Sequence, residues 1–275
     1  MQRLMAVTAA ICCLGGMFGG AAAGKSSHRG GGRVVVQRGQ SLQIAVAVDD
    51  TGFAASFGPS VREAVQMAIE RHPTIRGFAI QVNAFNAPCG NGSAASLADN
   101  AATAKAVVAN AQNVAVLGHF CSPEASAWLS IYEAAGVVTI NGSTTGVFVP
   151  PFGPMVFNGT AVPEPGFTPW YATVKTLSSD LRWRSRFQAR FGSPPTDFAD
   201  LYYDAANVLL AAIRETARVE RHNLVIDRES LAGNVRDTRG FPGVTCSMTL
   251  DPITGYRVDD AAELARCAHE SDGHH

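Results

Sequence analysis

The feature that most constrains the fold of this chain is a regular alternation of apolar runs and amphipathic segments between residues 42 and 145. Four short apolar runs, rich in β-branched residues, predict buried strands, and the segments between them repeat their apolar residues with the period of a helix. The expected strands are residues 42–48, 78–85, 114–117 and 137–140, and the expected helices are residues 59–71, 93–110 and 122–136. Because the connections are short, we expect an α/β fold with a doubly wound, mostly parallel sheet.

The alternation stops after Thr145, where prolines become frequent. This stretch leaves room for one short strand near residues 155–157. Apolar periodicity then predicts helices over residues 178–191, 197–219 and 227–236. A hairpin is expected over residues 244–258, around the turn sequence of residues 251–255.

The two ends of the chain are unlike its middle. Arg3, the apolar run that follows it and the small residues ending at Ala23 predict a secretory signal peptide over residues 1–23. An uncleaved membrane anchor and lipoprotein processing at Cys12 or Cys13 are the alternatives. Residues 24–38 then read as a flexible, basic, glycine-rich linker, and residues 268–275 as a polar tail. We therefore expect a periplasmic or otherwise extracytoplasmic protein.

Composition and motifs argue against several function classes. The net charge is −1 and only 16% of the residues are charged, so no basic field is present to attract nucleic acid. No nucleophile elbow, zinc-protease motif, phosphate loop or dinucleotide fingerprint occurs. We expect no catalytic residue, no cofactor and no metal, and we interpret Asp49 and Asp50 as a solvated turn. The enzyme alternative is a small hydrolase on a flavodoxin-like sheet, with Cys121 and His119 as its nucleophile and base.

If the protein is exported, its cysteines are expected to form disulfides, because disulfides persist outside the cytoplasm. Four cysteines follow the leader, and they allow three pairings. A Cys89–Cys121 bridge is preferred, because both residues lie at the same end of adjacent predicted strands. Cys246 and Cys267 are then left to pair with each other.

Polar residues gather where the predicted strands end. In open α/β sheets, ligands bind at the carboxyl ends of the strands. Ser122 follows the third strand and reads as the N-cap of a helix whose free N–H groups could hold a carboxylate. The hydroxyls of Ser143, Thr144 and Thr145 follow the fourth strand and could serve a ligand or an ordinary turn.

These segments carry a family likeness. The chain resembles the type I periplasmic solute-binding proteins, specifically the leucine/isoleucine/valine-binding branch that serves ABC importers. The likeness covers residues 41–145 and resumes from residue 187. The residues that carry it are Thr51-Gly52, Phe57-Gly58, the Cys89 loop, Val116 to Ser122, Ile131 to Gly136, Ile140 to Thr145, Arg190-Phe191-Gly192, Tyr202 to Ala206, Gly240 to Thr245 and Leu250-Asp251-Pro252.

The resemblance implies a ligand set and a partner. In the family, residues matching Ser122 and Thr145 hold the carboxylate of an amino acid, together with backbone groups of the loop that contains Ser143. Residues matching Phe57 and Phe120 line the pocket for its side chain, and the family's disulfide near the pocket matches Cys89 and Cys121. The implied ligand residues are Phe57, Phe120, Cys121, Ser122, Ser143, Thr144 and Thr145. The implied partners are a small amino acid or related carboxylate and the membrane permease of an ABC transporter.

Family members have two lobes, and this chain lacks room for the second. The segment between Thr145 and Thr168 is too short for a lobe that needs on the order of 100 residues. We expect a single lobe over residues 39–267, built from 39–147 and 166–240, with a remnant of the second lobe at 148–165 and 241–260. A one-lobe form predicts weak binding, unless a homodimer supplies the missing wall. A scaffold or sensor role is the alternative function.

Overall fold

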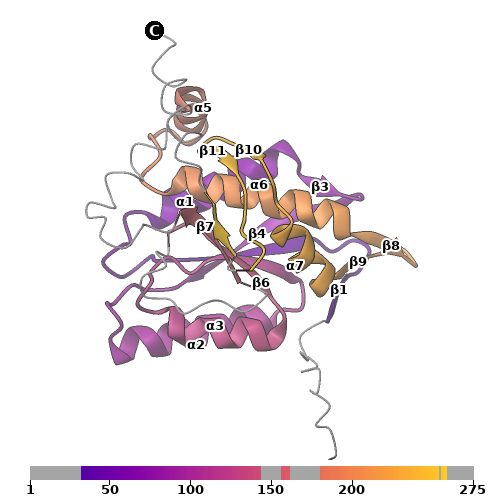
Figure 1. The fold of residues 1–275 in the computed structure, drawn as a ribbon, viewed down its shortest axis with the longest axis horizontal. Coiled ribbons are helices and arrows are strands. Elements are labelled where there is room, and N and C mark those ends of the chain that lie inside the picture. The colour runs from indigo at the N-terminus through magenta and orange to yellow at the C-terminus, as the bar shows by residue number, and fades with distance from the viewer. Residues whose placement is uncertain (1–31, 144–155, 162–179, 254, 259–275) are drawn as a thin grey trace, which may run out of the picture.

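A computed structural model describes residues 32–143, 156–161, 180–253 and 255–258 of the chain (Figure 1). Its centre is a seven-stranded sheet. The strands lie in the order β12 (Tyr256–Arg257), β7 (Val156–Ala161), β6 (Val138–Asn141), β5 (Asn113–Gly118), β2 (Leu42–Val48), β4 (Phe78–Asn86) and β3 (Thr74–Ile75). Every neighbouring pair from β12 to β4 is parallel, and only β3 pairs antiparallel with β4. The predicted α/β class with a mostly parallel, doubly wound sheet is confirmed.

Helices cover both faces of this sheet (Figure 1). The helices α1 (Gly58–Arg71), α6 (Ala199–Thr216) and α7 (Arg228–Arg236) pack on one face, and α2 (Ala94–Ala109) and α3 (Ala125–Ala135) pack on the other. A further helix, α5 (Leu181–Phe191), lies outside this layer, where Trp183 packs 5.4 Å from the ring of Tyr203 on α6.

The central strand β2 shows why the sequence produces three layers. Ile44, Val46 and Val48 belong to the core beneath α1 and α6, whereas Ala45 and Ala47 belong to the core beneath α2 and α3. Successive side chains of a strand point to opposite faces, so a run without polar residues can bury both of them. The small side chains lie on the face that receives Trp128 and Tyr132 of α3.

A second, three-stranded sheet lies at the amino ends of the central strands. Its order is β1 (Arg33–Val36), β9 (Asn223–Asp227) and β8 (Arg218–Glu220), with both pairs antiparallel. The predicted flexible linker through residue 38 is wrong over Arg33–Val36, because Val34 and Val36 are buried and pair with β9. The predicted helix over residues 197–219 is also too long, because Arg218 already begins the β8–β9 hairpin.

The carboxyl-terminal segments agree only in part with the prediction. At the predicted turn, Gly255 N donates to Asp251 O, and Leu250 forms an antiparallel bridge with Arg257. However, β11 (Cys246–Met248) pairs with β10 (Phe241–Gly243), and β12 joins β7. Thus β7 and β12 belong to the main sheet, whereas β10 and β11 form a separate two-stranded sheet. The assignment of residues 148–165 and 241–260 to a remnant of a second lobe stays a prediction.

The remaining expectations at the chain ends fall outside the described residues. These are the signal peptide over 1–23, the tail over 268–275 and the partner Cys267. Cys246 itself is disulfide-bonded. Among the helices that the structure describes, none combines the length and apolar character needed to cross a membrane.

Candidate functional site

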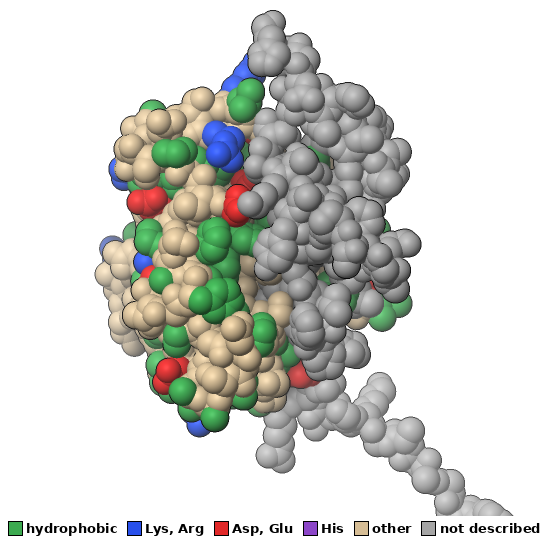
Figure 2. Space-filling view, turned by 90° about the vertical axis from the view of Figure 1, so that its left-hand side faces the viewer, with side chains coloured by type: hydrophobic (Ala, Val, Ile, Leu, Met, Phe, Trp, Pro, Cys, Tyr) green, Lys and Arg blue, Asp and Glu red, His purple; other side chains and the backbone are tan. Residues whose placement is uncertain are grey.

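The carboxyl ends of the central strands lie on the left in Figure 1, and Figure 2 looks onto that side. In the part of this side that is described, hydrophobic and uncharged side chains prevail and charged ones are scattered (Figure 2). The loops after β2, β4, β5 and β6 meet here, because all four strands run parallel. This edge is therefore where the sequence places its candidate site.

An aromatic cluster fills the centre of the edge. Phe120 stacks on Phe57 with ring centroids 5.6 Å apart and on Tyr202 at 6.3 Å, and Phe198 packs edge-on against Phe120 at 5.2 Å. Phe120 is only 6% exposed, whereas Phe57 is half-buried. The structure thus brings the two predicted phenylalanines together, with Phe57 as the more accessible ring. Sequence reasoning missed Phe198 and Tyr202, because they lie at the start of α6, far along the chain.

Ser143 is committed to contacts within the protein. Its Oγ donates to the carbonyl oxygen of Phe120 over 2.6 Å and lies 3.1 Å from the hydroxyl of Tyr202, while its amide donates to Asn141 Oδ1 over 2.8 Å. The Asn141 amide in turn donates to the carbonyl oxygen of His119. These bonds hold the turn after β6 against the turn after β5. Thr144 and Thr145 lie outside the described residues.

The predicted disulfide is confirmed. Cys89 and Cys121 are bonded, with their Cα atoms 5.7 Å apart. Cys89 follows β4 and Cys121 follows β5. These two strands were predicted to be adjacent, but β2 lies between them. The bridge therefore spans the end of the central strand, beside the half-buried Ser122.

The predicted N-cap at Ser122 is wrong. The helix α3 begins at Ala125 with Glu124 at the N-cap position, and no side chain caps it. Instead Glu124 is 1% exposed, and its Oε1 accepts from Gly90 N at 3.0 Å, Gly92 N at 2.9 Å and Ser96 Oγ at 2.9 Å. This carboxylate fastens the Cys89 loop to the start of α3, and these tertiary bonds override the local capping preference of serine.

His119 has a structural environment. It is fully buried, its ring nitrogens lie 2.6 Å from Asn100 Oδ1 and 2.8 Å from the Tyr132 hydroxyl, and it stacks on Trp128 at 5.1 Å. Burial lowers its pKa to about 3, so the ring is neutral at physiological pH. Because Cys121 is in the disulfide, the pair of Cys121 and His119 does not form a nucleophile and base.

The interpretation of Asp49 as a solvated acid is wrong, whereas Asp50 is part of an exposed turn. Asp49 is fully buried; its Oδ1 accepts from the amides of Thr51 and Gly52, and its Oδ2 from Ala54 N at 2.8 Å. Asp50 pairs with Arg62 over 2.6 Å. Asp49 therefore shapes the loop that presents Phe57. The described residues contain no group of three or more His, Cys, Asp or Glu that could hold a metal ion.

Comparisons with solved structures agree with this geometry. No protein-family model matches the chain, and no curated protein matches it by sequence. A protein from Rhodospirillum rubrum, provisionally named a branched-chain amino acid ABC transporter, is similar with a TM-score of 0.65 and 16% identity over 80% of this chain and 96% of that one. The substrate-binding protein LivJ from Streptococcus pneumoniae, solved with isoleucine, gives 0.62 and 14% over 80% and 94%.

A third similar structure binds an aromatic acid. It is a solute-binding protein from R. palustris solved with benzoate, with a TM-score of 0.60 and 11% identity over 80% of this chain and 91% of that one. At such identities the likeness shows the fold, which is that of the type I periplasmic binding proteins.

Proposed function

We propose that this chain is a non-catalytic solute-binding protein that takes a branched-chain amino acid, or a related small carboxylate or amide, at the carboxyl edge of its main sheet. The observation that carries the proposal is the gathering of Phe57, Phe120 and Ser122 beside the disulfide at that edge. The fold is shared with proteins solved with isoleucine and with benzoate, which are small carboxylates with an apolar body.

The residues of the edge take different roles in this proposal. The accessible ring of Phe57 offers an apolar surface to the side chain of the ligand, and Phe120 supports it from behind. Ser122 and the backbone at Cys121 bind the carboxylate, and Thr144 and Thr145, which lie outside the described residues, are the further ligands that the family resemblance implies. Ser143 acts as a positioning residue, because both its hydroxyl and its amide already donate within the protein.

Affinity depends on what lies across the edge from these groups. Two-lobed binding proteins close around their ligand and so shield its polar contacts from water. A single lobe leaves the ligand half solvated, so each hydrogen bond and charge contact competes with water. We therefore propose weak binding of leucine, isoleucine and valine by the isolated chain.

The proposal extends to location and partners. The predicted signal peptide places the protein in the periplasm or another extracytoplasmic space, where it would deliver its ligand to an ABC permease. A homodimer would supply the wall that the missing lobe leaves open. A scaffold or sensor role is the alternative, and it would need the same edge to face a partner protein instead of a free solute.

The test is a ¹H–¹⁵N NMR titration of the protein with isoleucine and, separately, with benzoate. We expect the amide signals of Gly52, Cys121 and Ser122 to shift, because these groups surround the proposed pocket. The Ser122→Ala variant removes the proposed hydroxyl and should weaken binding by about three- to ten-fold, the range for one hydrogen bond to a charged group that is partly solvated. Ser130→Ala is the matched control, since Ser130 is an exposed serine on α3, the helix that follows Ser122.

Two results would contradict the proposal. One is an absence of shifts at the carboxyl edge with either ligand up to about 10 mM. At that concentration, even a ligand with a binding free energy of only about −3 kcal/mol would occupy the site well enough to be seen. The other is equal weakening by Ser122→Ala and Ser130→Ala, which would mean that the ligand binds elsewhere.

A further inference from the structure

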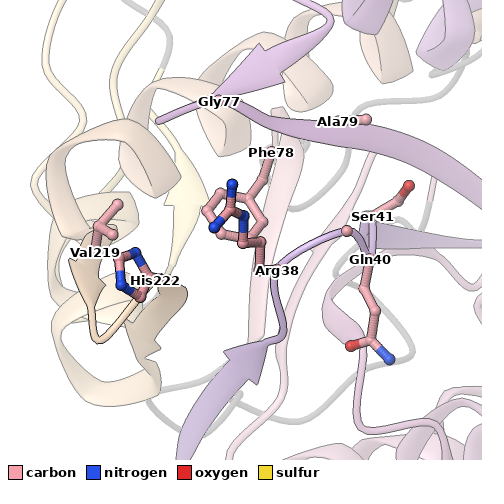
Figure 3. Close-up of a pocket in the computed structure, with 9 residues that line it drawn as sticks. Arg38, Gln40, Ser41, Gly77, Phe78, Ala79, Val219 and His222 are labelled. Carbon is pink, nitrogen blue, oxygen red and sulfur yellow. The ribbon is translucent and has the colours of Figure 1, made fainter.

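A hollow lies at the opposite edge of the main sheet, where the strands begin (Figure 3). It has a volume of about 400 Å³, within the range of small-molecule sites. Three segments line it: the β1–β2 turn with Arg38, the β3–β4 turn with Phe78, and the β8–β9 hairpin with His222. Because β2 is seven residues long, the hollow lies roughly 20 Å from the edge discussed above, at about 3.3 Å per residue.

The walls of the hollow are built from tight turns that hold one another. The amide of Arg38 donates to Asn223 Oδ1 over 3.3 Å, which ties the β1–β2 turn to the hairpin. Within that turn, Gln40 N donates to Gln37 O over 2.9 Å, and Gln37 N donates to Gln40 Oε1 over 3.1 Å. The hairpin turns through Arg221 and His222, which both have positive φ, at 49° and 72°. The turn backbone thus fixes where the side chains of Arg38 and His222 begin.

Figure 3 shows the side chains of Arg38 and His222 reaching into the same hollow from two different segments. None of the described residues that line it is acidic. The β8–β9 hairpin has two carboxylates: Glu220 is engaged by Arg33 at 2.5 Å, and Asp227 caps α7. The hollow therefore combines an arginine fork and an imidazole, with no acidic side chain in its described lining, a donor set that suits an anion.

The rest of the lining is apolar or neutral. The ring of Phe78 is 8% exposed at the base, and Val219 is 53% exposed at the rim. Arginine recognises carboxylate and phosphate through paired hydrogen bonds, and an apolar group beside it favours a ligand with a hydrocarbon part.

We propose that this hollow is a binding site for a small organic anion. A carboxylate or phosphate lies between Arg38 and His222, and the apolar body of the ligand rests on Phe78 and Val219. The site is independent of the proposed solute site, because it shares no residue with it and lies at the other end of the strands. The open shape and surface position predict a dissociation constant on the order of 1 mM at low salt.

The test is an NMR titration of the intact protein with phenyl phosphate at low ionic strength. The amide signals of Gly39, Ser41 and Gly77 report on the lining. We expect these signals to shift together, and we expect inorganic phosphate to bind about three- to ten-fold more weakly, because it lacks the apolar body. The expected shifts fade above about 0.3 M salt, where exposed charges are screened.

Variants assign the contact to named side chains. Arg38→Gln should weaken binding by about ten-fold or more, and His222→Gln by about three-fold, the losses expected for a charge-assisted and a neutral hydrogen bond. Arg221→Gln is the matched control. It also removes one positive charge, next to His222, but Arg221 does not line the hollow. It should change the affinity by less than about two-fold.

The proposal is overturned if the lining amides do not move with phenyl phosphate up to about 20 mM, or if Arg221→Gln weakens binding as much as Arg38→Gln. The second result would show a general attraction of anions to the hairpin instead of a site. Neither result bears on isoleucine, whose titration reports at Cys121 and Ser122.

Discussion

Removal of the Cys89–Cys121 bridge tests how the carboxyl edge is held together. The bridge joins residues separated by 32 positions. In the chain-entropy model, closing a loop of that size lowers the entropy of the unfolded chain enough to stabilise the fold by about 3.7 kcal/mol at 25 °C. The double variant Cys89→Ser, Cys121→Ser should therefore lose about 3–4 kcal/mol of unfolding free energy, which corresponds to a fall of about 7–15 °C in Tm.

The variant should still fold, because a second fastening remains. Glu124 binds the amides of Gly90 and Gly92, and the ring of Phe120 stays stacked on Phe57. Urea unfolding followed by circular dichroism, without reductant, measures the loss. The single variant Cys89→Ser is the control and should lose the same amount, since it also opens the loop. A loss below about 1 kcal/mol in both variants would refute the reasoning, because the loop would then not be closed in solution.

Three further substitutions probe single contacts by urea unfolding. Gly118→Ala should lose at least about 2 kcal/mol, because Gly118 has a φ of 126° and an added Cβ would collide with the carbonyl oxygen of Ala47; a change below about 0.5 kcal/mol would contradict this. Burial raises the pKa of Asp200 to about 6, above the 3.8 of an exposed aspartate, so its native state favours the neutral acid and stability falls as pH rises from about 4 to 6. Asp200→Asn should therefore be more stable than the wild type by on the order of 1–3 kcal/mol at pH 8, with no such gain at pH 3.5; a gain that does not depend on pH would contradict the assignment. Glu124→Gln keeps the acceptor oxygen but removes its charge, so it should lose about 1–2 kcal/mol, and an unchanged midpoint would show that the carboxylate does not fasten the Cys89 loop.

The main sheet could be predicted because its signals are local. Each central strand is a short apolar run, α1 has an apolar face, and α2 has a clear beginning. Ser93, for example, accepts from Ser96 N at 3.2 Å as an N-cap should. Asp227 likewise caps α7 as predicted, accepting from Ser230 N at 2.8 Å.

The second sheet could not be predicted because its partners are distant in sequence. Arg33–Val36 is a short strand next to a glycine-rich stretch, and it gains its order by pairing with Asn223–Asp227. The hairpin that supplies this partner turns through Arg221 and His222, which lack the asparagine and glycine that usually mark such turns. Strand pairing across such a separation leaves little trace in either segment.

At the carboxyl edge, the residues that meet could be predicted, but their individual contacts could not. The convergence of Phe57, Phe120 and the disulfide follows from parallel strands ending at one edge. The roles of Asp49 and Glu124 were missed, because a buried carboxylate that accepts backbone amides looks in sequence like any surface acid. The contact of Tyr202 with the turn after β6 was also missed, because nothing in the sequence next to Tyr202 indicates it.

The most direct measurement of the central claim is isothermal titration calorimetry of the protein that starts after residue 23, with leucine, isoleucine and valine in turn. We expect weak heats that fit dissociation constants far above 1 µM. A dissociation constant of 1 µM would require a binding free energy of about −8 kcal/mol. Sub-micromolar binding of any one of the three would contradict the one-lobe account, because it would require a second wall across the carboxyl edge.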